Sequence, residues 1–161
     1  MVKFQELYES HAADVYRFAL GLAGDSSEAE DITSETFIRA WVRSSRIRTE
    51  TLKAYLFAIA RNFYLEQRRK RKHQIRLEDV HPDPAPGPDK RVESKLELLR
   101  GQSFLQTLPE TDRTAFVMRV QHELPYAEIA RVLGLSLTAA RVKVHRVRKK
   151  LLTACFEKEV D

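Results

Sequence analysis

The sequence predicts an all-α fold of two small helical modules joined by a flexible, proline-rich linker. Only 5 glycines occur in 161 residues, and runs of β-branched residues are few. Apolar residues instead recur every three or four positions, which is the period of an amphipathic helix. The stretch "HPDPAPGP", residues 81–88, places four prolines among eight residues, and neither a helix nor a central strand accommodates them. We therefore expect modules over 1–72 and 94–161, with the linker over 73–93.

The first helix is expected over residues 4–23, because one face of this segment is apolar. The side chains on that face are Phe4, Leu7, Tyr8, His11, Val15, Phe18, Ala19 and Leu22. The sequence "GDSS" interrupts the pattern. Since Glu30 follows Ser27 by three residues, we expect a capping box to begin a second helix over 28–44.

The second and third helices complete the first module. The second is expected to bury Ile32, Phe37, Ala40 and Trp41. A basic turn, "SSRIRTE", then leads into a third helix over 51–71, which is expected to bury Leu52, Leu56, Ile59 and Phe63.

The second module is expected to open with a helix near 94–107. The sequence "LPETD" restarts the chain, and Thr111 or Asp112 is the expected cap of a helix over 111–122. That helix presents Ala115, Phe116 and Val120 to the core. Pro125 ends it and starts the next one.

The stretch "YAEIARVLGLSLTAARVKVHRVRKKL", residues 126–151, has the pattern of a helix-turn-helix. Its first helix buries Ile129, Ala130 and Leu133. Gly134 stands where a helix ends in a left-handed residue, Leu135 anchors the turn, and Ser136 or Thr138 caps the second helix. The expected buried stripe of that second helix is Ala140, Val144, Val147 and Leu151.

The opposite face of this second helix is polar and basic. It carries Thr138, Arg141, Lys143, His145, Arg146 and Arg148. A helix of this kind fits the major groove of duplex DNA, with its first half near base edges and its second half near phosphates. The alternative is that the charges only solvate a terminal helix. The turn pattern around Gly134 favours DNA binding.

A second basic helix, "AYLFAIARNFYLEQRRKRKH", lies upstream and combines aromatic with cationic side chains. Cations hold phosphates, and aromatic faces stack on unpaired bases. Taken singly, Phe63 and Tyr64 are better explained as core residues, and the "RRKRK" run could be a solvated helix end. Taken together, the face favours a nucleic acid, with Tyr55, Arg61, Arg68 and Arg69 as candidate contacts.

Charge is unevenly distributed along the chain. Residues 1–35 have 2 basic and 8 acidic side chains, a net charge of −6, whereas residues 36–72 have 11 and 2, a net charge of +9. Residues 73–93 carry −2, from 3 basic and 5 acidic side chains, and residues 94–161 carry +4, from 12 and 8. Alternating acidic and basic blocks predict different partners for different surfaces.

Several function classes are disfavoured by the sequence. The histidines are scattered, the single cysteine provides no zinc spacing, and no glycine-rich phosphate loop occurs. We therefore expect no enzyme, no metal, no cofactor and no small-molecule substrate. Cys155 is expected to be a buried, small apolar residue. Neither a membrane-spanning run nor a secretory signal is present, so we expect a cytoplasmic protein without membrane insertion.

In this order, the motifs resemble those of one family. An acidic "AEDITSETFIRAW" helix precedes an "AIARN…RR" helix, a proline-rich linker and the segment "LPETDRTAFVMRVQHELPYAEIARVLGLSLTAARVKVHRVRKKL". The chain is similar over nearly its whole length to the ECF-type (group IV, extracytoplasmic function) sigma factors of bacterial RNA polymerase. The resemblance implies that residues 1–72 form sigma region 2 and residues 94–161 form sigma region 4.

The resemblance also implies partners and site residues. Asp31, Glu35 and Arg39 would dock on the clamp helices of the polymerase β′ subunit. The helix with Asn62 would bind and melt the −10 element, with the loop 43–50 accommodating an extruded base. Region 4 would read the −35 element and touch the β flap. An anti-sigma factor is a further partner that the family implies, and it could hold the chain at the membrane.

Some residues depart from the family pattern. Glu66 stands where an aspartate is common, Ser34 where a glutamine is common, and Val142 where a serine is usual. The recognition helix begins with Thr138, Ala139, Ala140 and Arg141 in place of Gly-Thr-Val-Lys. These departures prevent transfer of a promoter sequence from relatives.

Two other functions are compatible with parts of the sequence. A stand-alone helix-turn-helix repressor or activator would use residues 1–72 for dimerisation or effector binding, but the basic–aromatic helix and the tether argue against it. The other is a sigma-mimicking protein that titrates a regulator and never starts transcription. The basic residues in both modules argue against it, because such a protein would not need them.

Overall fold

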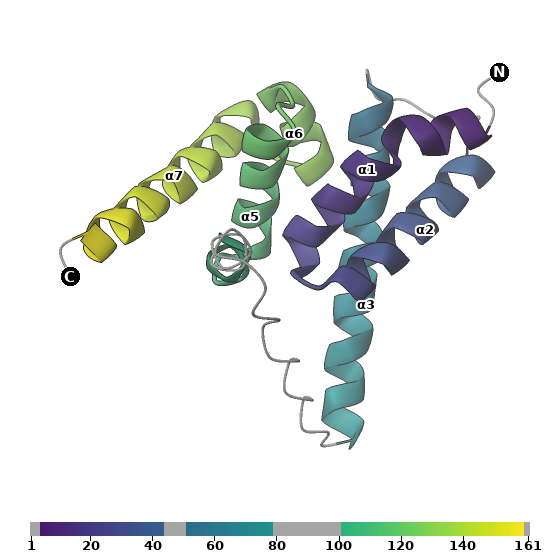
Figure 1. Cartoon of the computed structure of the whole chain (residues 1–161), viewed down its shortest axis with the longest axis horizontal. Helices are drawn as coiled ribbons and strands as arrows, with labels where there is room; N and C mark the ends of the chain where they lie inside the picture. Colours follow the sequence, from purple (N-terminus) through teal and green to yellow (C-terminus); the bar gives the residue numbers. More distant parts are fainter. Residues whose placement is uncertain (1–3, 44–50, 79–100, 160–161) are drawn as a thin grey trace.

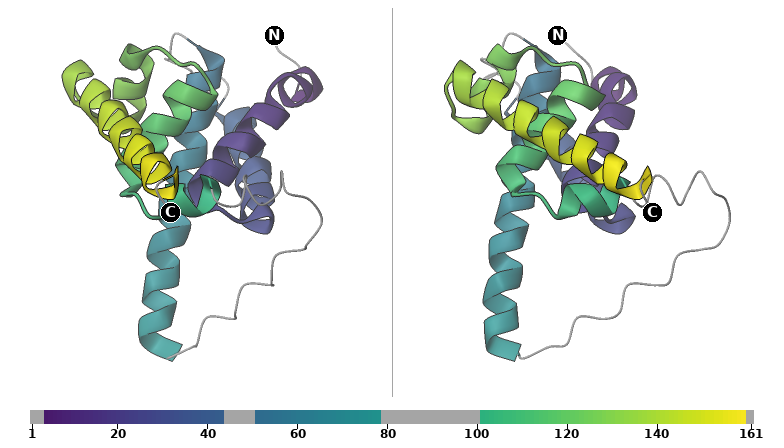
Figure 2. Two further views of the ribbon diagram at one scale, coloured as in Figure 1. Left: turned by 60° about the vertical axis from the view of Figure 1, so that its left-hand side comes forward. Right: turned by 90° about the vertical axis from the view of Figure 1, so that its left-hand side faces the viewer.

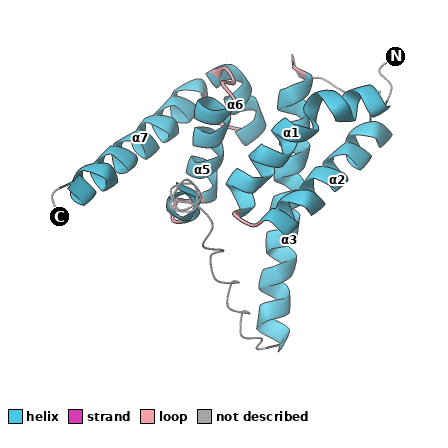
Figure 3. Cartoon of the chain, in the orientation of Figure 1, coloured by secondary structure: helices cyan, strands magenta, loops and turns pink. Residues whose placement is uncertain are grey.

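The computed structural model describes residues 4–43, 51–78 and 101–159. The helices are α1 (Phe4–Ala23), α2 (Ser26–Val42), α3 (Leu52–Glu78), α5 (Glu110–Phe116), α6 (Tyr126–Leu133) and α7 (Leu137–Glu159). A π-helical turn, η2 (Val117–Gln121), follows α5 directly, and residues 101–106 are also helical. The described residues contain no strand, so the predicted all-α class is confirmed (Figure 3). Most of the predicted linker, residues 79–93, lies outside the described residues.

Helices α1, α2 and α3 pack on one another and form the first module (Figure 1). The Phe18 ring of α1 stacks on the Phe57 ring of α3, with a centroid distance of 4.2 Å and an interplanar angle of 5°. Helix α3 continues to Glu78 rather than ending at residue 71, and its second half projects away from the rest of the protein (Figure 2).

The start of α2 differs from the expected capping box. The N-cap is Asp25, whose Oδ1 accepts a hydrogen bond from the Ser27 backbone N–H at 3.3 Å. Gly24, with φ 71°, ends α1 in a left-handed conformation, and Asp25 is extended. The helix therefore begins at Ser26, and Ser27 lies inside it. The prediction of Ser27 as cap was wrong by two residues because Gly24 fixes the turn.

The start of α5 and the turn after it also differ from expectation. The N-cap is Pro109, without a side-chain hydrogen bond, so neither Thr111 nor Asp112 caps the helix. The π-helical turn then adds one residue per turn and rotates the following side chains. Val117 and Met118 are buried, whereas Val120, predicted to be in the core, is 46% exposed.

The helix-turn-helix has the predicted geometry. Gly134 has φ 67° and ψ 37°, and the Leu135 N–H donates to the Ala130 carbonyl at 2.9 Å. Ser136 is the cap of α7, since its Oγ accepts from the Ala139 N–H at 3.1 Å. Ala140, Val144 and Val147 are fully buried. Leu151, expected in the same stripe, is 37% exposed.

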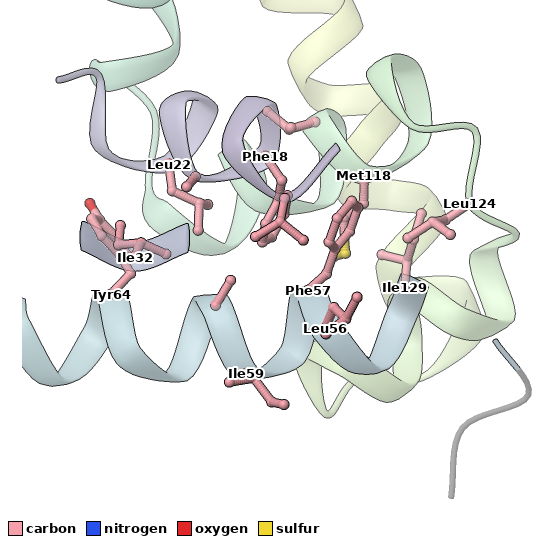
Figure 4. Packing of buried hydrophobic residues seen from close by; sticks show 14 of the residues in the cluster. Phe18, Leu22, Ile32, Leu56, Phe57, Ile59, Tyr64, Met118, Leu124 and Ile129 are labelled. Carbon is pink, nitrogen blue, oxygen red and sulfur yellow. The ribbon is translucent and has the colours of Figure 1, made fainter. Parts of the chain in front are cut away.

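The two modules share one hydrophobic core. Phe18 and Phe57 of the first module lie in one buried cluster with Met118 and Ile129 of the second (Figure 4). Gly21 of α1 permits close approach, because a Cβ at that position would lie 3.1 Å from the Val117 side chain. Small domains bury a limited share of their apolar surface, so joining two of them stabilises both.

Some residues predicted to be buried lie at the surface. Phe4, Tyr8 and Trp41 are each about two-fifths exposed and form aromatic contacts at one end of α1 and α2, with the Phe4 and Trp41 rings 5.5 Å apart. Cys155 is exposed, so the expectation of a buried cysteine was wrong. It lies in the last part of α7.

A shared core predicts that a cavity in the second module destabilises the first. Met118→Ala should lower the free energy of unfolding by about 2–5 kcal/mol. Fluorescence of Trp41 in α2 and far-ultraviolet circular dichroism should shift together in a denaturant titration. Val120→Ala, on the same turn but exposed, should change stability by less than about 0.5 kcal/mol. A Trp41 transition that stays at the wild-type midpoint in Met118→Ala would contradict the shared core.

Candidate nucleic-acid interface

The exposed face of α7 carries most of the predicted duplex-binding residues. Thr138, Arg141, His145, Arg146 and Arg148 are all exposed. This orientation follows from the buried stripe on the opposite face, which packs on α5 and α6. The structure therefore groups five of the six predicted residues on one solvent-facing surface.

Lys143 is the exception on this helix. Its Nζ lies 3.0 Å from Asp112 Oδ1, and the two side chains are 24% and 4% exposed. Lys143 therefore ties α7 to α5, and a DNA contact would require it to leave Asp112 or to share its charge.

Tyr126 is a residue of this site that the sequence analysis did not single out. Its ring lies 4.3 Å from the Arg119 guanidinium carbon and 5.7 Å from that of Arg141. Such cation–π contacts restrain Arg141 at the start of the recognition helix. The signal in the sequence was an aromatic residue at the first position of α6, directly after Pro125.

The residues of α3 that were predicted to bind single-stranded DNA differ in their exposure to solvent. Asn62 and Arg69 are exposed, Tyr55 is partly buried, and Tyr64 is in the core. Arg68 is exposed and donates from Nε to Tyr64 Oη at 2.6 Å. The basic run after Arg68 lies on the projecting half of α3 (Figure 2).

Arg61 is held by the second module. Its Nε and Nη2 donate to the two carboxylate oxygens of Glu110 at 2.8 and 3.0 Å, and the two side chains are only 15% and 21% exposed. Burial raises the pKa of the Glu110 carboxyl, but hydrogen bonds from Arg61 and Thr114 outweigh it, so the pKa lies below its ordinary value. Arg61 is thus not free for nucleic acid in this arrangement.

The predicted polymerase-docking residues lie on α2. Asp31 is exposed, while Glu35 and Arg39 are partly buried. Arg39 donates from Nε to Glu35 at 3.0 Å and from Nη1 and Nη2 to Glu66 of α3 at 3.2 and 2.8 Å. These hydrogen bonds hold the pKa of the Glu66 carboxyl below its ordinary value. Arg39 therefore fastens α2 to α3, and Glu66, a departure from the family pattern, is its partner.

His122 is a buried polar group between the modules that the sequence analysis treated as scattered. It contacts the edges of the Phe18 and Phe57 rings, at centroid distances of 6.1 and 4.7 Å. Asp14, Arg17 and Lys53 line a polar pocket beside it, and Lys53 donates to the His122 carbonyl at 3.2 Å. Burial, with the nearby charge of Lys53, lowers the pKa of His122 to about 4.

Within the described ranges, no three His, Cys, Asp or Glu side chains are grouped so that they could hold a metal ion. No helix in the described part of the chain has the length and apolar character that crossing a membrane requires.

Comparison with known families gives two matches along the chain. Residues 7–74 match Sigma-70 region 2, and residues 102–151 match Sigma-70, region 4. These ranges coincide with the two groups of helices described above.

Two curated relatives align over most of this chain. The ECF RNA polymerase sigma factor SigE of Mycolicibacterium smegmatis is 35% identical over 162 residues, covering 94% of this chain and 61% of SigE. The ECF RNA polymerase sigma factor SigM of Bacillus subtilis is 30% identical over 151 residues, covering 91% of each chain. This chain thus spans less than two thirds of SigE and nearly all of SigM.

Solved structures resemble the fold as well. The sigma factor RpoE of Bartonella quintana, in complex with the anti-sigma factor NepR, matches with a TM-score of 0.79 and 26% identity, covering 92% of this chain and 93% of that one. The sigma factor SigJ of Mycobacterium tuberculosis matches with a TM-score of 0.61 and 25% identity, covering 91% of this chain and 52% of SigJ.

The environment of His122 predicts acid sensitivity. Its pKa is about 4 in the folded chain, against an ordinary value of 6.5, so the unfolded chain takes up the proton first as pH falls. The free energy of unfolding should therefore decrease between pH 6.5 and 4, by about 2–3 kcal/mol in total from this residue. His122→Phe should flatten the slope of urea-measured stability between pH 6.5 and 5. An identical slope in both proteins would show that His122 does not cause it.

Proposed function

This chain belongs to the ECF sigma factors of bacterial RNA polymerase, which direct the polymerase to promoters, and we propose how its residues divide that work. The proposal is carried chiefly by one observation. The turn at Gly134 orients α7 so that its buried stripe packs inward while Thr138, Arg141 and their basic neighbours face solvent.

Region 4 reads the −35 element as duplex DNA. Thr138 and Arg141 lie near the start of α7, where a helix in the major groove reaches base edges. His145, Arg146 and Arg148 lie further along and contact phosphates. Lys143 joins them when DNA competes with Asp112 for its charge.

Region 2 binds the −10 element and assists its melting. Asn62 is exposed in the middle of α3, and its amide can hydrogen-bond the edge of an unpaired base. Tyr55 offers a partly exposed aromatic face, and Arg68 and Arg69 offer cations for the backbone. Arg61 adds a further phosphate contact once it is released from Glu110.

Core RNA polymerase docks on α2 and on region 4. Asp31 and Glu35 face the β′ clamp helices, with Arg39 positioning Glu35, and region 4 contacts the β flap. An anti-sigma factor is a further partner, supported by the fold shared with a sigma factor that has been solved in such a complex. We assign this initiation factor no catalytic step, cofactor or metal. Its location is the cytoplasm, where the polymerase works, with the membrane reached only through an anti-sigma factor.

Run-off transcription tests the function directly. Purified core polymerase should transcribe a promoter template only when the full chain is added. A footprint with two-fold symmetry, obtained without polymerase, would instead identify a dimeric helix-turn-helix regulator.

The docking assignment predicts a charge-reversal phenotype. Asp31→Arg combined with Glu35→Arg should abolish co-purification with core polymerase, because it replaces a negative surface with a positive one. Circular dichroism should remain that of a helical fold, since neither side chain is in the core. Glu6→Arg with Glu9→Arg makes the same change in charge on α1 and should retain binding. Unchanged co-purification of the α2 double mutant would remove α2 from the docking surface.

The two basic helices should fail at different steps of initiation. Arg141→Ala should weaken binding of holoenzyme to closed promoter DNA, by about 1–3 kcal/mol if it contacts a base. If Arg141 contacts only a phosphate, the loss of affinity should be similar for all DNA sequences. The slope of log affinity against log salt concentration should then decrease in magnitude by about one. Lys150→Ala, an exposed cation elsewhere on α7, is the control and should bind nearly normally.

Asn62→Ala should bind the closed promoter nearly as wild type does but open it poorly. A template already mismatched across the start site should restore part of its transcription, whereas the Arg141 variant should gain less. Permanganate footprinting of unpaired thymines and filter binding measure the two steps. Failure of both variants at the same step would contradict the division of roles between α3 and α7.

A further inference from the structure

The contact between Arg61 and Glu110 joins a predicted DNA-binding residue of region 2 to the first turn of α5 in region 4. Two N–H groups of Arg61 meet the two oxygens of one carboxylate, at 2.8 and 3.0 Å. The planar guanidinium binds carboxylate and phosphate with the same fork of donors. Glu110 therefore occupies the part of Arg61 that a nucleic-acid phosphate would use.

The Glu110 carboxylate is held in place by its own helix. Thr114 donates from Oγ1 to Glu110 Oε1 at 2.8 Å, one helical turn away. Both members of the Arg61–Glu110 pair are largely removed from solvent. Thr114 therefore helps to orient the carboxylate that Arg61 contacts.

A second contact lies one turn further along α3. Tyr64 Oη accepts from Arg113 Nη2 of region 4 at 2.9 Å, and also from Arg68 Nε of region 2 at 2.6 Å. Arg113 is 2% exposed and also donates to the Leu108 carbonyl at 3.1 Å. Region 4 thus contacts Arg61 directly and reaches Arg68 through Tyr64.

We propose that Glu110 acts as an internal competitor for nucleic-acid phosphate. In the free chain it occupies Arg61 and helps to hold region 4 against α3. Arg61 becomes available to DNA when the two modules separate. The proposal rests on the phosphate-binding role given to Arg61 under the proposed function, and it adds an autoinhibitory contact to that role.

The Arg61 guanidinium is paired with an anion in both states. It exchanges the Glu110 carboxylate for a DNA phosphate, so it is never left without a counter-charge. What must be separated is the shared core, in which Phe57 of α3 lies with Met118 and Ile129. The packing of the shared core determines mainly whether the modules are together or apart, and Glu110 is therefore expected to shift that equilibrium towards the packed state.

The separation of the two modules can be measured directly in this chain. We call the packing of region 4 against α3 closure. Its single tryptophan, Trp41, lies in region 2, and its single cysteine, the exposed Cys155, lies in region 4. A dye on Cys155 reports energy transfer from Trp41 in the full-length protein. Glu110→Arg should lower the transfer, because it places two guanidinium groups together, and Glu110→Gln should lower it less.

Exchanging the charges of residues 61 and 110 shows whether Glu110→Arg acts by charge repulsion or by misfolding. Arg61→Glu combined with Glu110→Arg should restore the transfer towards the wild-type value. Glu28→Gln breaks the 3.1 Å pair between Glu28 and Arg71, which lies wholly within region 2, and should leave the transfer unchanged. Wild-type transfer in both Glu110 variants would overturn the role of Glu110 in holding the modules together.

Binding of the full chain to labelled single-stranded DNA tests the second half of the proposal. Glu110→Gln should bind several-fold more tightly at low salt, and its slope of log affinity against log salt should steepen by about 0.7, the value for one added phosphate contact. Glu30→Gln makes the same change in net charge at an exposed position and should not change the slope. Arg61→Ala added to Glu110→Gln should abolish the gain.

The possible failures are distinguishable. If Glu110→Gln opens the chain without steepening the slope, Arg61 makes no phosphate contact, and both the competition and the DNA role of Arg61 are wrong. Run-off transcription by the wild-type chain would still support the sigma-factor function. If the slope steepens while energy transfer stays unchanged, Glu110 masks Arg61 without holding the modules together, which overturns closure.

Discussion

The stacked rings of Phe18 and Phe57, with Met118 and Ile129 packed in the same cluster, are the contact on which the other features of the structure depend. Small helical modules bury only a limited share of their apolar surface on their own. In the shared core Phe57 is completely buried. The same contact brings the first turn of α5 beside α3, so that Glu110 and Arg113 can meet cations and hydroxyls of region 2.

This packing divides α3 into two halves with different environments. The first half is covered on several sides and supplies the core. The second half projects into solvent and carries the basic run that follows Arg68 (Figure 2). A nucleic acid would therefore find the projecting half accessible and the first half partly covered. Helix α7 differs, because its buried stripe packs within region 4 and its basic face is open apart from Lys143.

The sequence predicted what depends on local pattern. The period of apolar residues predicted α1 and α2 within a few positions but ended α3 seven residues early, and Gly134 predicted the helix-turn-helix. Contacts between the modules have no such period, so neither the shared core nor the partner of Arg61 could be predicted. The π-helical turn at 117–121 was missed because it changes register without a distinctive residue. Amphipathic spacing also placed Phe4 and Trp41 inside, although their helices end before a neighbour can cover them.

The aromatic and cationic residues on α3 could not be assigned one by one, from the sequence, to nucleic-acid binding or to packing. An aromatic face and a guanidinium fork suit unpaired bases and phosphates, and they suit a packed helix and a carboxylate equally well. Tyr64 and Arg61 both meet region 4 in this arrangement, whereas Asn62, between them in the chain, faces solvent. Side chains on one helix are therefore committed to different partners according to the direction in which they point. A change in the separation of the modules would alter the partners of Arg61 and Tyr64 while leaving the exposure of Asn62 as it is.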